Sequence, residues 1–239
     1  SLALHLSSYG RSNNEANPAQ WVSGNVAAEF ENYNFVSDGW ITDAEGITAL
    51  RTTGDARLTI PLKIFEKDFR STGKTIELDF ASRDILNYDA VILSCWSGNR
   101  GLQLTAQRAL LKSESSAIST QYKEGEHVRL SFVVQKRSAY RLLQVYINGI
   151  LSGVIQYPDG DDFSQNEPVN ITVGSNDCTI DLYTIRVYDN DLTRFQILDN
   201  WIADTQDIEK LIEKYQPEFE EKLKTAFAFF LGRGYQSRF

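Results

Sequence analysis

Residues 143–153 constrain the fold of this chain more than any other segment, because a two-residue turn stands between alternating side chains. From Leu143 to Ile147 every second residue is apolar, a period of two that is typical of a strand with one buried face. The next two residues, Asn148-Gly149, tolerate the positive φ angles that a type I′ turn requires. The chain is therefore predicted to fold straight back through residues 150–156 as a β-hairpin.

A second informative segment covers residues 179–198. Its first part is rich in β-branched residues and stops at Asp189-Asn190-Asp191, as a strand that ends in a turn does. The residues from Leu192 onward then favour a short helix that begins from an Asp or from Thr193, because both residue types cap helix N-termini.

Short alternating or β-branched runs recur before Thr193, and the connections between them are rich in Asn, Asp, Gly and Ser. No helix-length apolar pattern interrupts these runs. Regularly spaced strands without intervening helices pair antiparallel in a two-sheet sandwich. The predicted strands are residues 26–35, 56–62, 75–82, 90–96, 101–106, 127–134 and 169–173.

The hairpin motif Tyr146-Ile-Asn-Gly-Ile-Leu151 and the closing strand that begins Ile180-Asp-Leu-Tyr-Thr-Ile-Arg-Val-Tyr-Asp189 together resemble the concanavalin A-like, laminin-G-like jelly roll. Residues 4–204, including 9–18, 73–77 and 119–123, resemble more narrowly the jelly-roll module of tail-associated structural proteins of phages that infect Gram-positive bacteria. The resemblance implies an all-β, antiparallel two-sheet jelly-roll sandwich with a short C-terminal helical extension.

The same resemblance implies a non-catalytic structural module of a phage tail or baseplate, located in the virion. Such a module would bind host-surface carbohydrate during adsorption or act as a spacer. Two alternatives from other classes remain: a β-sandwich glycoside hydrolase and a bacterial cell-surface adhesion module. A hydrolase needs two acids that face each other in a groove, whereas a lectin needs aromatic and polar groups without such a pair.

The chain is predicted to divide into a jelly-roll domain at residues 1–204 and a C-terminal helical extension at residues 205–239. Apolar residues recur at spacings of three and four from Ile208 to Phe230, which is typical of amphipathic helices. This stripe predicts a homo-oligomer through the C-terminal helices. Two alternatives remain open: the stripe folds back on its own domain, or the last residues are foreign to the jelly roll.

Composition excludes several classes of function. The net charge of −8 and the lack of a basic stripe argue against a nucleic-acid partner. No run of 18 apolar residues is available to span a membrane. The two cysteines, Cys95 and Cys178, are expected to be reduced and buried. The chain begins at Ser1, contains no Met and shows no signal peptide, which we interpret as a fragment of a longer protein.

One strand carries candidate catalytic acids. Glu77 and Asp79 alternate with apolar residues, and β-sandwich endoglucanases carry Glu-x-Asp-x-x-Glu on such a strand. Ser82 stands in the third position, and retaining hydrolysis needs two carboxyl groups about 5 Å apart. We therefore predict no catalytic residues and interpret Glu77 and Asp79 as a solvated strand face. His127, next to Glu126, is expected to be an exposed turn histidine.

Candidate binding residues lie in two places. Trp96, with Asn99 and Arg100, offers an aromatic face beside amide and guanidinium donors, which suits a sugar ring; Trp40 invites the same interpretation. Core packing is the alternative for both tryptophans. The acidic loop with Asp159, Asp161 and Asp162 could hold Ca²⁺, although an ordinary turn explains it as well. No other cofactor is expected.

Overall fold

The computed structural model describes residues 1–61, 73–97, 100–112, 117–158 and 170–203. Contacts within the chain divide it into two compact units, residues 1–199 and residues 200–239. The two predicted domains and their boundary at residue 204 stay a prediction. The helical extension at residues 205–239, with its apolar stripe, lies outside the described residues.

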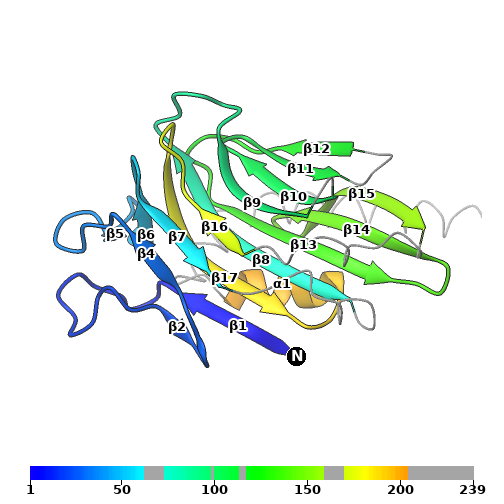
Figure 1. Ribbon diagram of the computed structural model, residues 1–239, viewed down its shortest axis with the longest axis horizontal. Helices are drawn as coiled ribbons and strands as arrows, with labels where there is room; N and C mark the ends of the chain where they lie inside the picture. The colour runs from blue at the N-terminus through cyan, green and yellow to red at the C-terminus, as the bar shows by residue number, and fades with distance from the viewer. Residues whose placement is uncertain (62–72, 98–99, 113–116, 159–169, 204–239) are drawn as a thin grey trace, which may run out of the picture. The chain divides into compact units, whose positions relative to one another are not determined.

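The described part of the first unit is built from two large antiparallel sheets (Figure 1). The eight-stranded sheet has the order β15-β14-β13-β8-β17-β6-β5, and β1 also pairs with β17. The seven-stranded sheet has the order β12-β11-β10-β9-β16-β7-β4. The first sheet comprises β1 (Leu2–Ser7), β5 (Trp40–Thr42), β6 (Thr48–Thr52), β8 (Lys74–Arg83), β13 (Val128–Lys136), β14 (Tyr140–Ile147), β15 (Ile150–Pro158) and β17 (Thr179–Tyr188). The second comprises β4 (Glu29–Glu31), β7 (Arg57–Ile60), β9 (Val91–Ser97), β10 (Arg100–Thr105), β11 (Arg108–Lys112), β12 (Ala117–Gln121) and β16 (Ile171–Val173). A small additional sheet pairs β2 (Val22–Ser23) with β3 (Val26–Ala27).

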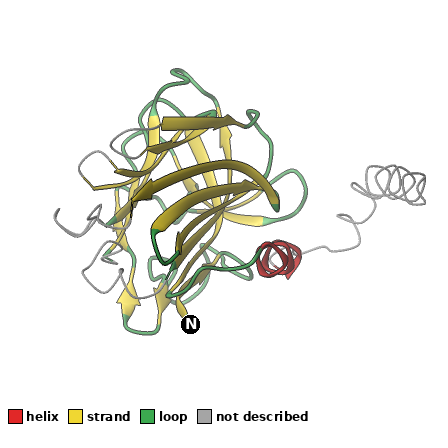
Figure 2. Cartoon of the chain, turned by 90° about the vertical axis from the view of Figure 1, so that its right-hand side faces the viewer, coloured by secondary structure: helices red, strands yellow, loops and turns green. Residues whose placement is uncertain are grey.

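The core lies between the two layers of strands that Figure 2 shows. From β8 and β13, Leu78, Phe80 and Leu130 point inward, and from the second sheet Leu58 and Leu102 meet them in the same buried cluster. Side chains alternate between the two faces of a strand, so the intervening residues of β8 and β13 lie on the outer face. The all-β jelly-roll-like sandwich that the sequence predicts is confirmed.

The predicted hairpin is confirmed at the tip of β14 and β15. Ile147 pairs with Ile150, and the two turn residues have φ angles of 50° at Asn148 and 75° at Gly149. Two successive positive φ angles define the type I′ turn that matches the twist of the flanking strands.

The helix α1 (Arg194–Ala203) begins where the sequence predicts it. The Gln196 backbone N–H donates to Thr193 Oγ1 at 3.3 Å, and the Thr193 N–H donates to Gln196 Oε1 at 2.9 Å. This reciprocal capping box satisfies N–H groups that have no partner within the helix. Ile197 packs with Val133 and Tyr146 on the outer face of the first sheet.

The single predicted strand at residues 26–35 is wrong in its extent. Residues 26–27 belong to β3 and residues 29–31 to β4, after which Asn32 has a φ of 59° that ends the extended run. Tyr33 and Phe35 leave the strand and stack on each other with ring centroids 5.6 Å apart. After Glu31 the chain is therefore held by the contact between the two aromatic rings and not by hydrogen bonds to a neighbouring strand.

Two further expectations concern cysteines and membranes. Cys178 is buried and has a free thiol, as expected. Burial raises the pKa of this thiol to about 11. The side chain of Cys95 is not among those that the structure describes. Within the described ranges, no helix is both long and apolar enough to cross a membrane.

Candidate binding site

The loop between β1 and β2, residues 8–21, is anchored at both ends. At its start, the Ser8 N–H donates to the Tyr183 carbonyl at 2.9 Å. At its end, the indole N–H of Trp21 donates to the Ser7 carbonyl at 3.1 Å. The Trp21 ring also meets Trp40 edge to face, with centroids 5.2 Å apart. The backbone hydrogen bond of Ser8 fixes the start of the loop, and the Trp21 side chain fixes its end.

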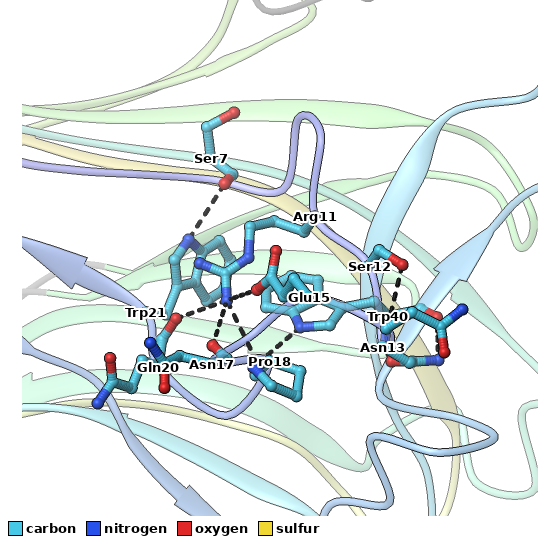
Figure 3. A network of polar contacts seen from close by, with 11 residues as sticks. Ser7, Arg11, Ser12, Asn13, Glu15, Asn17, Pro18, Gln20, Trp21 and Trp40 are labelled. Atoms are coloured by element: carbon cyan, nitrogen blue, oxygen red, sulfur yellow. Dashed lines mark hydrogen bonds and ion pairs between the residues drawn. The ribbon is translucent and has the colours of Figure 1, made fainter.

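Arg11 organises the interior of this loop (Figure 3). Its Nη2 atom lies within hydrogen-bond distance of three carbonyl oxygens, at 2.6 Å from Gln20 and 3.3 Å from Asn17 and Pro18. Arg11 also forms an ion pair with Glu15. Because the Arg11 guanidinium bonds three carbonyl groups from different points of the loop, it holds the loop in a defined conformation.

Trp40 lies beneath Arg11 and is only 4% exposed. The Arg11 guanidinium carbon is 4.6 Å from the centroid of its ring, a cation–π arrangement. The indole N–H donates to the Pro18 carbonyl at 2.7 Å. Asn13 Oδ1 accepts from the backbone N–H of Trp40, and Asn13 Nδ2 donates to the backbone carbonyl of Trp40. Of the two roles considered for Trp40, the structure shows core packing. The expectation of an open stacking platform does not fit, because neighbouring groups cover the ring.

An open cavity of about 360 Å³ is lined by Arg11, Glu15, Asn17, Gln20 and Val22. Its volume lies within the range of small-molecule sites. The lining provides amide donors and acceptors and one charge-paired carboxylate, beside the half-exposed apolar Val22. Hydroxyl groups need such donors and acceptors, and a small apolar face suits the C–H side of a sugar ring.

These residues were not predicted as a site. In the sequence, segment 9–18 carries only a family resemblance. The Asn and Gln residues near Pro18 were a usable signal, but the contact between Trp21 and Trp40 joins distant parts of the sequence and is visible only after folding.

The residues predicted to bind carbohydrate are not brought together with Trp40. Trp96 and Arg100 lie at the β9–β10 connection, where Gly101 pairs with Trp96 and Arg100 with Ser97. Trp40 belongs to β5 of the other sheet. The side chains of Trp96 and Arg100 are not described, and Asn99 lies outside the described residues, so their carbohydrate-binding role stays a prediction.

The predicted calcium ligands Asp159, Asp161 and Asp162 also lie outside the described residues. In the part of the chain that the structure describes, no group of three His, Cys, Asp or Glu side chains is placed to hold a metal ion. The calcium expectation therefore stays untested.

Glu77 and Asp79 do not form a solvated face, and that expectation is wrong. Both are at most 1% exposed on β8, on the outer face of the sheet. Ser131 Oγ donates to Glu77 at 3.1 Å, and Arg129 lies 3.5 Å from Glu77 and 3.3 Å from Asp79. Ser82 faces the opposite side and donates to the Ala106 carbonyl. The two acids are charge-paired inside the protein.

His127 is likewise not an exposed turn residue. Its side chain is 19% exposed and ion-paired with Asp79, and its ring stacks on Tyr183 with centroids 4.1 Å apart. Burial alone lowers the pKa of His127, but the Asp79 carboxylate outweighs burial and raises it. Burial raises the pKa of Asp79, but His127 and Arg129 together lower it below its ordinary value.

Comparisons with known proteins give a fold and no family. No family model matches the sequence, and no curated protein matches it. Among solved structures, the receptor-binding domain of botulinum neurotoxin D superposes with a TM-score of 0.60 at 13% identity, over 85% of this chain and 52% of that chain. The binding domain of botulinum neurotoxin DC, solved with SialylT, gives a TM-score of 0.59 at 14% identity, over 86% and 52%.

A third structure concerns botulinum neurotoxin type C, whose cell entry is described as dependent on interaction with two ganglioside molecules. It gives a TM-score of 0.58 at 15% identity, over 86% of this chain and 51% of that chain. At such identities the likeness shows the jelly-roll-like fold alone. The chain spans about half the length of each of these structures.

Proposed function

We propose that this chain is a non-catalytic carbohydrate-binding module, and that it serves a phage tail or baseplate in adsorption to host-surface glycans. The observation that carries the proposal is the open cavity on loop 8–21 of a jelly-roll-like sandwich, which offers both amide groups and an apolar surface. The resemblance of the sequence to tail-associated jelly-roll modules supports the phage assignment. Solved structures that share the fold include the receptor-binding domain of botulinum neurotoxin D, and two others are described with SialylT or with two ganglioside molecules.

The cavity is suited to neutral hydroxyl-rich ligands. Its only guanidinium, that of Arg11, already forms an ion pair with Glu15 and hydrogen bonds with backbone carbonyls. The groups left to a ligand are the exposed amides of Asn17 and Gln20 and the apolar surface of Val22. Amides bind vicinal hydroxyls as donor and acceptor at once.

A hydrolase is disfavoured by the state of the acids on β8. Glu77 and Asp79 lie on one face of one strand and are both buried and charge-paired. A retaining mechanism needs one carboxyl group as acid and one as nucleophile across an accessible substrate. We expect laminarin, lichenan and host cell wall to release no reducing ends above background, and turnover that vanishes in Glu77→Gln would contradict the proposal.

A glycan array probed with the purified chain tests the binding function. We expect a restricted set of glycans to bind, and binding of none would refute the proposal. For a glycan that binds, Asn17→Ala combined with Gln20→Ala should weaken binding at least about tenfold, the effect of losing 1.4 kcal/mol of hydrogen bonding. Asn14→Ala is the matched control, because Asn14 is an exposed amide of the same loop outside the cavity lining.

A further inference from the structure

Two arginines on the outer face of the first sheet share one buried carboxylate. Arg51 on β6 donates to both oxygens of Asp181, from Nε to Oδ1 at 2.6 Å and from Nη2 to Oδ2 at 2.7 Å. Arg83 at the end of β8 donates from Nε to the same Oδ2 at 3.0 Å. The Asp181 side chain is 0% exposed, whereas those of Arg51 and Arg83 are 30% and 35% exposed.

Strand register produces this arrangement. On β17, between β8 and β6, Asp181 is the direct partner of Arg51 on one side and of Ala81 on the other. Arg83 lies two residues beyond Ala81 and therefore projects from the same face. The carboxylate thus fixes two cationic side chains from different strands. Arg51 Nη2 and Arg83 Nε donate to the same oxygen, Asp181 Oδ2, so the two guanidinium groups are direct neighbours.

The charges at this point do not balance. Two guanidinium groups, close enough to repel each other, share one carboxylate. Among the described residues, neither arginine pairs with a second acid. A further anion would relieve the repulsion between Arg51 and Arg83.

Hydrogen-bond donors remain available on both arginines. A guanidinium has five N–H donors; Arg51 uses two on Asp181, while Arg83 uses Nε on Asp181. The remaining N–H groups belong to side chains that are about one third exposed. Because Asp181 already fixes both planes, a ligand would not have to order them, which lowers the entropic cost of binding.

We propose that Arg51 and Arg83 form a second binding site, which takes the carboxylate or phosphate group of a small anionic ligand. Planar guanidinium groups bind both oxyanions through paired N–H donors. Asp181 is a positioning residue that holds the arginines and does not contact the ligand. This site is separate from the neutral cavity on loop 8–21 and stands on different residues, so it does not depend on the function proposed above.

Calorimetric titration of the full chain with glucuronate, glycerol phosphate and glucose tests the site. We expect saturable binding of at least one anion and none of glucose by this site. Binding of glucuronate alone would assign the site to carboxylates, and binding of glycerol phosphate alone would assign it to phosphate esters. If neither anion binds, the proposal is wrong.

Arg83→Gln removes one cation and leaves the two-point contact between Arg51 and Asp181. It should weaken anion binding at least about tenfold, because a charge-assisted hydrogen bond contributes about 1.4 kcal/mol or more. Arg108→Gln is the matched control: Arg108 is also a partly exposed arginine that pairs with an aspartate, Asp89. Equal losses in both variants would show general electrostatic attraction and overturn the site.

A second variant guards against a folding defect. If Arg83→Gln does not melt cooperatively, Arg51→Lys keeps the charge beside Asp181 but removes the planar fork, and it should also weaken anion binding. Unchanged binding in a folded Arg51→Lys protein would overturn the proposal. A glycan array without neutral binders leaves these titrations valid, so the two proposals fail independently.

Discussion

Arg129 illustrates what single residues contribute to this fold, because it is the largest fully buried side chain among the described residues. Its guanidinium lies between Glu77 and Asp79, and Ser131 adds a hydrogen bond to Glu77. A buried ion pair adds little net stability over an apolar pair, but removal of one partner leaves a charge in a medium that solvates it poorly. The outer face of the first sheet is therefore sensitive to single charge changes.

The first prediction concerns Asp79→Asn. This change removes the carboxylate that pairs with both Arg129 and His127, and we expect the free energy of unfolding to fall by about 3 kcal/mol. Urea unfolding followed by tryptophan fluorescence measures it. Asp89→Asn, at an exposed ion pair with Arg108, is the control and should cost less than about 1 kcal/mol. Similar losses in both variants would contradict the burial argument.

The second prediction concerns pH. Asp79 raises the pKa of His127 above its ordinary value of 6.5 despite burial, and Asp43 acts in the same direction while Arg129 opposes it. A raised folded-state pKa gives stability that is fully present below pH 6.5 and is lost as pH rises through the folded value. The free energy of unfolding of the wild type should therefore fall from mildly acidic to alkaline pH relative to His127→Gln.

Urea unfolding of both proteins at a series of pH values measures this difference. His5 remains in both proteins, so its own titration cancels in the comparison. A difference that stays constant with pH would show that His127 is not charged in the folded state.

At the scale of elements, turn and cap chemistry locate the ends of β14, β15 and α1. Asn148-Gly149 gives the hairpin its two positive φ angles, and Thr193 with Gln196 caps the helix. The same hairpin tip also touches α1, since a Cβ built on Gly149 would lie 3.0 Å from Leu198 Cδ1. Gly149 is therefore required both for the backbone geometry of the turn and for the close packing of the turn against α1.

The third prediction separates these two effects at Gly149. Gly149→Ala should reduce the free energy of unfolding through backbone strain of about 1–2 kcal/mol and additionally through the close contact with Leu198. Gly24→Ala is the control, because Gly24 also has a positive φ of 60° but no atom lies within 4 Å of the added Cβ. Thermal and urea unfolding should show the larger loss at Gly149. Equal losses of unfolding free energy in both variants would mean that α1 shifts to make room for the added methyl group without a loss of stability.

At the scale of the whole molecule, the chain is a sandwich unit followed by a second unit. Among the residues that the structure describes, the core cluster joins both sheets of the sandwich and contains none beyond Val187. Leu192 and Ile197 extend the packing onto the outer face through α1. The described sandwich therefore has its own core, as an independently folding domain needs.

The fourth prediction concerns assembly and follows from the apolar stripe between Ile208 and Phe230. We expect residues 1–204 to stay folded as a monomer and the full chain to form an oligomer, since large exposed apolar patches generally mark interfaces. Light scattering and thermal unfolding of both proteins measure this. A monomeric full-length chain would contradict the oligomer, and a destabilised fragment would show that the stripe packs on its own domain.

The sequence by itself determined the hairpin, the start of α1 and the strands β7 to β10, β13, β16 and β17, because alternation, positive-φ residues and caps act over a few neighbouring residues. It did not predict β1, β5, β6, β11 and β12. Only the tertiary structure decided the environment of each polar side chain. Glu77 and Asp79 are buried because β13 places Arg129 and Ser131 beside β8, and Trp40 is covered because loop 8–21 places Arg11 over it. Arg51 meets Asp181, 130 residues away, through strand pairing. Alternation predicts that a residue points to one face of a sheet, but it does not predict which distant chain segment covers that face.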